Sequence, residues 1–245
     1  MVSKNQTRLL ASLQQKKYRY KYGLFIAEGL KVVKELLNSS FEPEALYTTE
    51  SGILSNPKVE EVLITKAKIK QISALKTPSN VLAVFKIPAF RNPETKGLIV
   101  ALDGVRDPGN LGTIIRLCDW YGVSQLLCSP DTVDVYNPKV VQATMGSLAR
   151  VNVHYGVLED FFQKIDLPVY GAVMKGKDVY SCNLPEEGVL VMGNEANGIS
   201  NGLMGYLTHK ITIPRYGKLQ QAESLNVATA TGVLLSEFRR GLIQK

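Results

Sequence analysis

The sequence predicts an α/β protein of two parts, a small α/β domain followed by a larger domain with a mostly parallel sheet. Short apolar runs alternate with helical patterns along most of the 245 residues, as expected for strands that are covered by helices. A break with Pro88, Pro93 and polar neighbours interrupts this alternation near residue 90. We therefore expect a first domain over residues 1–90, a linker over 91–96 and a second domain over 97–245.

The elements of the first domain follow from its apolar periodicity. The pattern predicts a helix over residues 4–15, a strand over 24–27, a helix over 30–37 and a strand over 45–48. A shorter α/β stretch ends near residues 81–85. These elements are sufficient for a small α/β unit with its own core.

The second domain contains six short apolar runs, with helical patterns between most of them. The runs cover residues 98–102, 125–128, 151–153, 169–173, 189–192 and 211–213. Ligands on parallel sheets bind at the loops that follow the carboxyl ends of the strands. Those loops are therefore the expected place of a functional site.

Composition excludes several classes of protein. No apolar run approaches the roughly 18 residues of a membrane-spanning helix, and the N-terminus lacks the apolar core of a secretory signal. We expect a cytoplasmic protein, although the basic, acid-free start could also be read as a mitochondrial transit peptide. Three cysteines and two distant histidines indicate neither a disulfide framework nor a metal site, so no metal is predicted.

The positive charge is concentrated in the first part of the chain. Residues 1–96 hold 16 Lys and Arg against 8 Asp and Glu, whereas the remaining residues hold 13 against 14. Tyr18, Tyr20 and Tyr22 alternate with the last of the early basic residues. Cations neutralise phosphates and aromatic rings stack on bases, so this asymmetry favours RNA or DNA as partner over a merely solvated helix face.

Two nucleotide-binding patterns can be rejected. Residues 171–178 have the spacing of a phosphate-binding P-loop, but Asp178 replaces the hydroxyl residue that binds magnesium. A carboxylate at that position would repel phosphate. No Gly-x-Gly-x-x-Gly follows any predicted strand, so a nicotinamide or flavin site has no support.

Three loops after predicted strands carry polar side chains. In the first, Asn110 lies at the start of a helix, either as its cap or with a free amide facing the crevice, and Arg116 lies opposite that helix's apolar stripe. The second is Gly193-Asn-Glu195-Ala-Asn-Gly198, and the third is Ile213-Pro followed by Ser224-Leu-Asn-Val-Ala228. Each taken alone is explained by a cap, a turn or close helix packing.

Together, in order and spacing, the three loops resemble the motifs of the SpoU (TrmH-like) branch of the SPOUT methyltransferases. That pattern contains Asn-x5-Arg after a strand, Gly-Asn-Glu-x-x-Gly, and Ile-Pro followed by Ser-Leu-Asn-Val-Ala. Residues 137–147 are similar to a further family stretch, with Thr144 and Ser147 in place of its usual Ser and Ala. The resemblance implies a C-terminal trefoil knot, which no periodicity predicts, and a homodimer with the last helix at its interface.

The first domain is similar to the substrate-binding domain of many family members, which is related in fold to ribosomal protein L30e. The resemblance rests on Lys4-Asn5, on the run Lys16-Lys17-Tyr-Arg19, and on residues 25–29. It agrees with the charge asymmetry, so we expect Lys4, Asn5, Lys16, Lys17 and Arg19 to contact RNA.

The resemblance also implies S-adenosylmethionine as cofactor, and it assigns roles in the second domain. Gly193, Ile213 and Leu225 are expected to contact the cofactor. Arg116 matches the family's catalytic arginine. Because arginine keeps its proton at neutral pH, we interpret it as a clamp for the target phosphate and the developing 2′-oxyanion rather than as a base. Further catalytic residues that orient the groups are Asn110, Glu195, Ser224 and Asn226.

The resulting hypothesis is an RNA 2′-O-ribose methyltransferase, with ribosomal RNA preferred over transfer RNA because of the L30e-like first domain. One alternative is a catalytically silent RNA-binding or ribosome-assembly factor on the same fold. A silent factor would have no physical need to keep the polar residues Asn110, Arg116, Glu195, Ser224 and Asn226 together. A second alternative, methylation of a base, is disfavoured by the arginine and the Ser-Leu-Asn loop.

Overall fold

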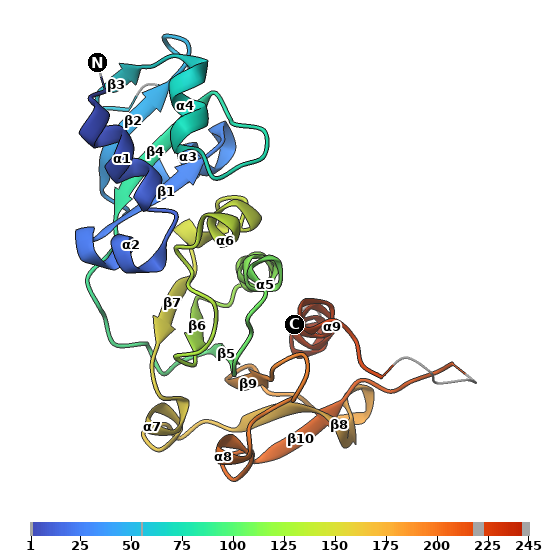
Figure 1. Cartoon of the computed structure of the whole chain (residues 1–245). Coiled ribbons are helices and arrows are strands. Elements are labelled where there is room, and N and C mark those ends of the chain that lie inside the picture. The colour runs from blue at the N-terminus through green and yellow to red at the C-terminus, as the bar shows by residue number, and fades with distance from the viewer. Residues whose placement is uncertain (1, 55, 218–222, 242–245) are drawn as a thin grey trace. The chain divides into compact units, whose positions relative to one another are not determined.

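The computed structural model describes residues 2–54, 56–217 and 223–241 of the chain (Figure 1). The chain folds into two compact units. The first unit contains the described residues up to Phe90 together with Asp134–Arg150, and the second contains Arg91–Val133 and the described residues from Val151 onward. Each unit has its own sheet and core.

The first unit is a four-stranded sheet with helices on both faces. Its strands lie in the order β1 (Leu24–Glu28), β4 (Val81–Lys86), β2 (Pro43–Thr48) and β3 (Glu61–Leu63). β4 pairs antiparallel with β1 and β2, and β3 pairs parallel with β2. Its sheet-covering helices are α1 (Lys4–Ser12), α3 (Leu30–Leu37) and α4 (Lys66–Ile72). Alternation along the strands sends Ile26 and Val84 toward α1 and α4, while Phe25 and Phe85 lie on the opposite face.

The predicted first helix ends three residues early, and a helix that was not predicted follows it. α1 ends at Ser12, and a second helix, α2 (Lys16–Tyr22), follows a short turn and ends at Gly23, which has a φ of +64°. Apolar periodicity could not find α2 because its sequence, KKYRYKY, has no apolar stripe. Its position instead depends on Arg19.

The prediction that Arg19 contacts RNA is wrong, because its side chain is 2% exposed. Its Nε donates to Asp134 Oδ2 at 2.9 Å, and one terminal nitrogen donates to the carbonyls of Leu13 and Gln14. The other terminal nitrogen also bonds Asp134. Because the guanidinium is buried and bonded to these partners, a phosphate cannot reach it. Arg19 therefore holds α2 in place.

Residues 134–150 pack with the first unit, against the predicted boundaries, which placed them in the second domain. The segment contains α6 (Pro138–Ala143) and the short helix η1 (Ser147–Ala149). Tyr136 lies 4.7 Å from Phe25 between ring centroids, and Arg150 forms an ion pair with Glu35 of α3. The connection between two strands of the second unit therefore passes through the first.

The second unit is a six-stranded parallel sheet, as predicted. Its strands lie in the order β10 (His209–Thr212), β8 (Val169–Asp178), β9 (Gly188–Met192), β5 (Leu98–Leu102), β6 (Gln125–Cys128) and β7 (Asn152–Tyr155). Helices cover both faces of this sheet (Figure 1). They are α5 (Pro108–Trp120) and α9 (Val227–Arg240) on one face, and α7 (Leu158–Phe162) and α8 (Asn201–Met204) on the other.

β8 is longer than predicted and contains the rejected P-loop pattern. Gly171, Lys177 and Asp178 all belong to this strand rather than to a phosphate-binding loop. A short helix, η2 (Val179–Ser181), follows it. None of the helices in the described part of the chain is long and apolar enough to cross a bilayer.

Candidate active site

The three loops singled out in the sequence follow β5, β9 and β10. Because all six strands run parallel, their carboxyl ends lie at the same edge of the sheet. β5 and β9 are neighbours, so the loops that follow them start side by side. The third loop returns to this edge through the start of α9.

The first turn of α5 frees the side-chain amide of Asn110. Asp107 is the N-cap, and its Oδ1 accepts the backbone N–H of Asn110 at 2.8 Å. Pro108 occupies the first turn, where no backbone donor is needed. Of the two predicted positions for Asn110, the structure therefore has the second, an amide that faces the crevice.

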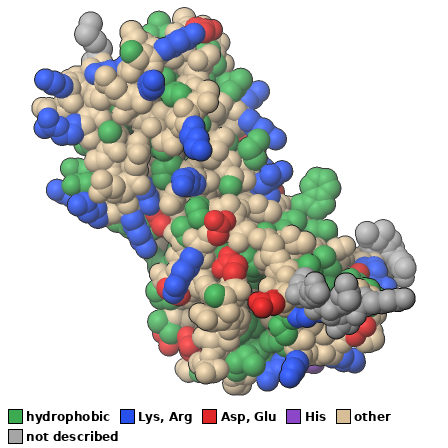
Figure 2. All heavy atoms as spheres, turned by 45° about the vertical axis from the view of Figure 1, so that its right-hand side comes forward, with side chains coloured by type: hydrophobic (Ala, Val, Ile, Leu, Met, Phe, Trp, Pro, Cys, Tyr) green, Lys and Arg blue, Asp and Glu red, His purple; other side chains and the backbone are tan. Residues whose placement is uncertain are grey.

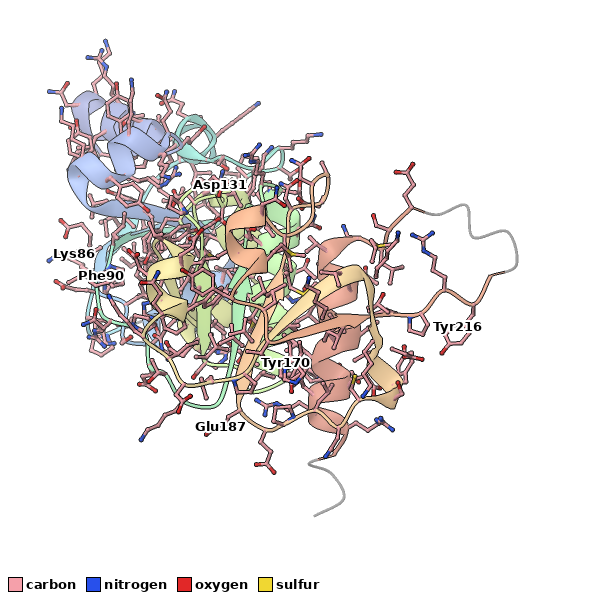
Figure 3. All side chains as sticks on the ribbon, turned by 90° about the horizontal axis from the view of Figure 1, so that it is seen from below. Lys86, Phe90, Asp131, Tyr170, Glu187 and Tyr216 are labelled. Carbon is pink, nitrogen blue, oxygen red and sulfur yellow. The ribbon has the colours of Figure 1, made fainter. Side chains whose placement is uncertain are left out.

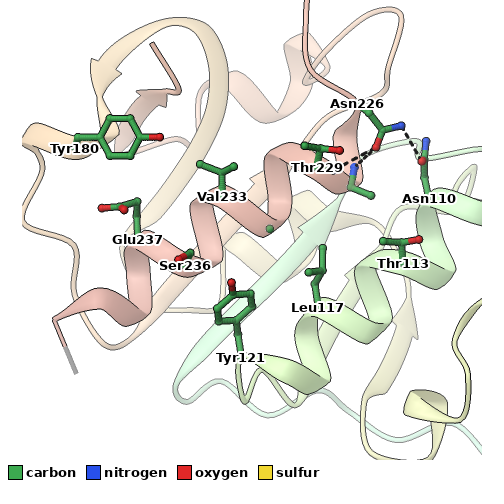
Figure 4. A pocket seen from close by; sticks show the side chains of 12 residues that line it. Asn110, Thr113, Leu117, Tyr121, Tyr180, Asn226, Thr229, Val233, Ser236 and Glu237 are labelled. Carbon is green, nitrogen blue, oxygen red and sulfur yellow. Dashed lines mark hydrogen bonds between the residues drawn. The ribbon is translucent and has the colours of Figure 1, made fainter. Parts of the chain in front are cut away.

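Hydrogen bonds join one residue from each of the three loops. Asn226 Nδ2 donates to Asn110 Oδ1 at 2.9 Å, and Asn110 Nδ2 donates to Glu195 Oε1 at 2.8 Å (Figure 4 shows the first of these). The Oδ1 of Asn226 caps α9 by accepting the N–H groups of Ala228 and Thr229. Each amide is thus oriented at both ends, and the carboxylate of Glu195 is held beside them.

The loop after β9 is a tight turn that requires glycine at its start. A Cβ on Gly193 would lie 2.2 Å from the carbonyl carbon of Gly198 and 2.3 Å from the nitrogen of Ile199. Asn194 closes the turn through paired backbone hydrogen bonds with Gly198, and its Nδ2 donates to Gly104 O at 2.6 Å. The turn therefore fixes both the backbone at Gly193 and the position of Glu195.

Sequence reasoning missed a second polar cluster at the same edge. Ser129, after β6, accepts the N–H of Gly104 at 2.8 Å and donates to Asp131 Oδ1 at 2.6 Å. The hydrogen bond from Ser129, together with Arg106, holds the pKa of Asp131 below its usual range. Asp103 accepts the N–H of Ser200 at 2.6 Å. A Ser-Pro-Asp sequence directly after a predicted strand was the available signal.

Other expected site residues are not joined to this network. Arg116 is exposed on α5, and within the described residues it forms neither a hydrogen bond nor an ion pair. Ser224 is also exposed and likewise lacks a hydrogen bond to any described residue. Ile213 is half-buried, whereas Leu225 is 50% exposed.

Residues 213–217, which follow β10, form the described start of the third loop. Tyr216, which is 80% exposed, lies on the part that extends away from the helices and strands (Figure 3). The carbonyl of Glu223 accepts a hydrogen bond from Arg215 across this loop. Where the described chain continues into α9, Asn226 lies beside Asn110.

An open groove of about 630 Å³ lies along α5 and α9 and ends at the paired amides (Figure 4). Small residues of α9 allow the two helices to approach closely, and a Cβ on Gly232 would lie 3.4 Å from Leu117. The groove is lined by Asn110, Thr113, Leu117, Tyr121, Tyr180, Asn226, Ala228, Thr229, Gly232, Val233, Ser236 and Glu237.

Two family models match the chain. One, described as the SpoU rRNA Methylase family, covers residues 97–236 and therefore more than half of the sequence. The chain belongs to this family. The other, an MRM3-like substrate binding domain, covers residues 4–83. The predicted family and α/β fold class are thus confirmed, whereas the knot stays a prediction.

Several relatives are similar to this SpoU-family chain over nearly its full length. It is 30% identical over 234 residues to the 23S rRNA (guanosine(2553)-2'-O)-methyltransferase RlmP of Bacillus subtilis, covering 93% of each chain. A structure from Porphyromonas gingivalis, assigned to the TrmH family of RNA methyltransferases, is 39% identical, with a TM-score of 0.90 over 98% and 99% of the two chains. An AdoMet-bound rRNA methyltransferase from Sinorhizobium meliloti is 31% identical, with a TM-score of 0.85 over 99% and 97%.

The remaining residues expected to contact RNA lie on the surface of the first unit. Lys4 and Asn5 are exposed in the first turn of α1, and Lys16 and Lys17 are exposed at the start of α2. Figure 2 shows Lys and Arg side chains spread over the visible face of this unit. All four side chains are therefore accessible to a polyanion.

Proposed function

We propose that this chain transfers a methyl group from S-adenosylmethionine to a ribose 2′-hydroxyl of ribosomal RNA. The observation that carries the proposal is the hydrogen-bonded chain Asn226–Asn110–Glu195, which joins the three family motifs at one edge of the parallel sheet. The named activities of the Bacillus subtilis and Sinorhizobium meliloti relatives support the same reaction and ribosomal RNA as substrate. The cytoplasmic location stays a prediction.

Gly193, Ile213 and Leu225 are proposed to hold the cofactor. The AdoMet-bound relative supports its identity. Leu225 is a large apolar side chain that is 50% exposed, which suits contact with a flat, weakly polar adenine. Backbone groups of the tight turn at Gly193 are proposed to supply hydrogen bonds to the cofactor. When bound, the cofactor supplies an electrophilic methyl group on a sulfonium.

Arg116 is proposed to act on the RNA rather than on the cofactor. Its guanidinium is exposed and without a partner among the described residues, so all of its donors are available. A permanently charged fork binds a phosphate and stabilises negative charge on the 2′-oxygen as its proton leaves to solvent or to a phosphate oxygen. Asn110, Glu195, Ser224 and Asn226 orient the ribose and the loops.

We further propose that the active form is a homodimer. Asn110 and Arg116 are six residues apart on α5, so at 100° per residue their side chains point about 120° apart. Arg116 of one chain therefore diverges from the amides of the same chain. A second copy that covers the groove along α5 and α9 would bring a further α5 next to Asn110 and Asn226.

The role of Arg116 is tested with Arg116→Ala. We expect methyl transfer to fall by roughly 100-fold or more, while the affinity for S-adenosylmethionine in calorimetry stays unchanged. Labelled methyl transfer to ribosomal RNA, followed by nucleoside analysis, measures the activity and shows whether the label is on ribose. Arg91→Ala, an exposed arginine outside the site, is the control.

Either of two results would contradict this assignment. Substantial turnover by Arg116→Ala would remove Arg116 from the reaction. Labelled methyl found on a base instead of a ribose would show that the chain methylates bases. If the wild-type chain bound the cofactor but left the RNA unlabelled, a non-enzymatic RNA-binding factor would be favoured.

A further inference from the structure

The outward surface of α2 consists of lysine and tyrosine side chains. Lys16, Lys17 and Lys21 are exposed, and Tyr22 is 41% exposed. None of the three lysines forms an ion pair with a residue that the structure describes. The acidic residue that contacts this helix, Asp134, is buried and already paired with Arg19. The outer face of α2 therefore carries uncompensated positive charge.

Two residues anchor the helix to Asp134, the buried Arg19 and Tyr20, which is itself 51% exposed. Arg19 bonds Asp134 and the carbonyls that precede α2, and the Tyr20 hydroxyl donates to Asp134 Oδ1 at 3.0 Å. Burial, followed by the Asp134 carboxylate, raises the pKa of Tyr20, so its hydroxyl keeps the donated proton. Because Arg19 and Tyr20 are fixed, the rotation of α2 about its axis is fixed too. The side chains opposite them are presented in a defined direction.

On this presented face, Tyr18 and Tyr22 form a parallel pair. Their ring centroids lie 6.3 Å apart, and the ring planes differ by 14°. The Nζ of Lys17 lies over the Tyr18 ring, 4.7 Å from its centroid, and the Nζ of Lys21 lies over the Tyr22 ring, 5.4 Å from its centroid. Each aromatic ring thus has a lysine ammonium in contact with it, and a flexible lysine side chain can turn from the ring to a phosphate.

Stabilisation of the helix alone does not account for this arrangement. Ring and cation contacts four or one residues apart do support a short helix. The position of α2, however, is already set by the buried guanidinium and the Tyr20 hydroxyl. A pair of parallel aromatic rings, with Tyr22 exposed and Tyr18 partly buried, lies beside lysines that have no ion-pair partner among the described residues. This is instead the composition of surfaces that bind single-stranded nucleic acid.

We propose that Tyr18 and Tyr22 form a stacking platform for unpaired bases of the RNA substrate, with Lys17 and Lys21 on the adjacent phosphates. This inference rests on the proposed function, because it takes RNA as the ligand. It assigns to α2 a preference for unpaired over duplex RNA, since only unpaired bases offer their faces to a ring. The exposed residues of α1, Lys4 and Asn5, would then contact the backbone without that preference.

The experiment compares two fluorescently labelled probes by anisotropy, a 12-nucleotide oligoadenylate and a 12-base-pair RNA duplex, with the full chain. We expect Tyr18→Leu and Tyr22→Leu each to weaken binding of the oligoadenylate by roughly 5- to 150-fold, as for the loss of one stacked base. Duplex binding should change less than about twofold. Tyr18→Phe and Tyr22→Phe keep the ring and are expected to bind both probes as the wild type does.

A second readout separates charge from stacking. Lys17→Ala and Lys21→Ala should weaken the binding of both probes. For the single strand, each lysine removed should also lower the slope of log affinity against log salt concentration by roughly 0.7. The tyrosine variants should leave this slope unchanged. If a leucine variant lowers the melting temperature, glutamine at the same position replaces it.

Three results would overturn the inference. Leucine variants that bind the oligoadenylate like the wild type would show that the rings do not stack, and phenylalanine variants as weak as leucine would assign the effect to the hydroxyl. A wild-type chain that binds the duplex but not the oligoadenylate would exclude the platform while leaving the proposed function intact. A chain that binds neither probe would count against RNA as the ligand and so against both.

Discussion

Two physical requirements can explain why residue 193 is glycine, and the structure shows one of them. The loop itself requires glycine, because a Cβ would overlap the backbone of Gly198 and Ile199 at 2.2 and 2.3 Å. The second reason, implied by the family resemblance, is close approach of the cofactor to this backbone. A substitution at this position therefore changes the loop before it changes any cofactor contact. Leu225 is the better residue to probe the cofactor, since half of its surface is free.

We expect Gly193→Ala and Leu225→Ala to behave differently. Gly193→Ala should lower the free energy of unfolding by about 1–3 kcal/mol, because the neighbouring backbone has to shift. Leu225→Ala should leave stability within about 0.5 kcal/mol but weaken S-adenosylmethionine binding. Chemical denaturation and calorimetry measure the two effects. Unchanged cofactor affinity in a folded Leu225→Ala would remove Leu225 from the cofactor site.

Arg19 and Asp134 connect two elements that are distant in sequence. The bonded residues lie 115 positions apart, and they join α2 to the segment that leads into α6. Both side chains are almost completely buried, at 2% and 4% exposed. Because a buried charge without its partner is costly, this pair makes the packing of residues 134–150 with the first unit dependent on α2.

Single and double substitutions test this connection. Arg19→Met and Asp134→Leu should each lower the free energy of unfolding by about 3–5 kcal/mol, because each leaves an unpaired buried charge. The double variant should lose less than the sum of the two. The exposed pair Lys86–Glu42 is a matched control within the same unit, with an expected effect of about 0–1 kcal/mol on removal. Additive losses in urea unfolding would show that the two side chains do not interact energetically.

The groove along α5 and α9 bears on the assembly of the whole molecule. Its lining combines apolar side chains, such as Leu117 and Val233, with polar ones, such as Thr229, and it ends at Asn110 and Asn226. A partner seated there would exclude water beside the amides, where hydrogen bonds to a developing charge are strongest when dry. The exposed direction of Arg116 is consistent with a role across such an interface.

The proposed homodimer predicts a molecular mass of twice 27.0 kDa in light scattering. Ser236→Arg places a long charged side chain in the groove at an exposed position, so it should give a monomer and reduce methyl transfer. Asn201→Arg, exposed on α8 at the opposite face of the sheet, should remain dimeric. A monomeric and fully active wild-type chain would contradict the proposal.

Local patterns were enough to predict the strands and most sheet-covering helices. The buried runs of β5, β6 and β9 are continuous in sequence, and Leu111, Ile114, Ile115 and Cys118 form the predicted buried stripe of α5. Helix α2 was missed because its sequence has no apolar period. Asn110 could not be placed as cap or free amide, since Asp107 competes for the same role three residues earlier.

The sequence alone shows that three polar loops follow three apolar strands in a fixed order. This could be predicted because strand burial and turn formation depend on neighbours a few residues away. From this order the family, the fold class and the candidate site residues could be predicted. The contact of Asn226 with Asn110, across 116 residues, and the burial of Arg19 against Asp134, across 115, depend on partners that no local pattern specifies. Only folding brought these groups together, and it thereby assigned Asn110 to the site and Arg19 to the core.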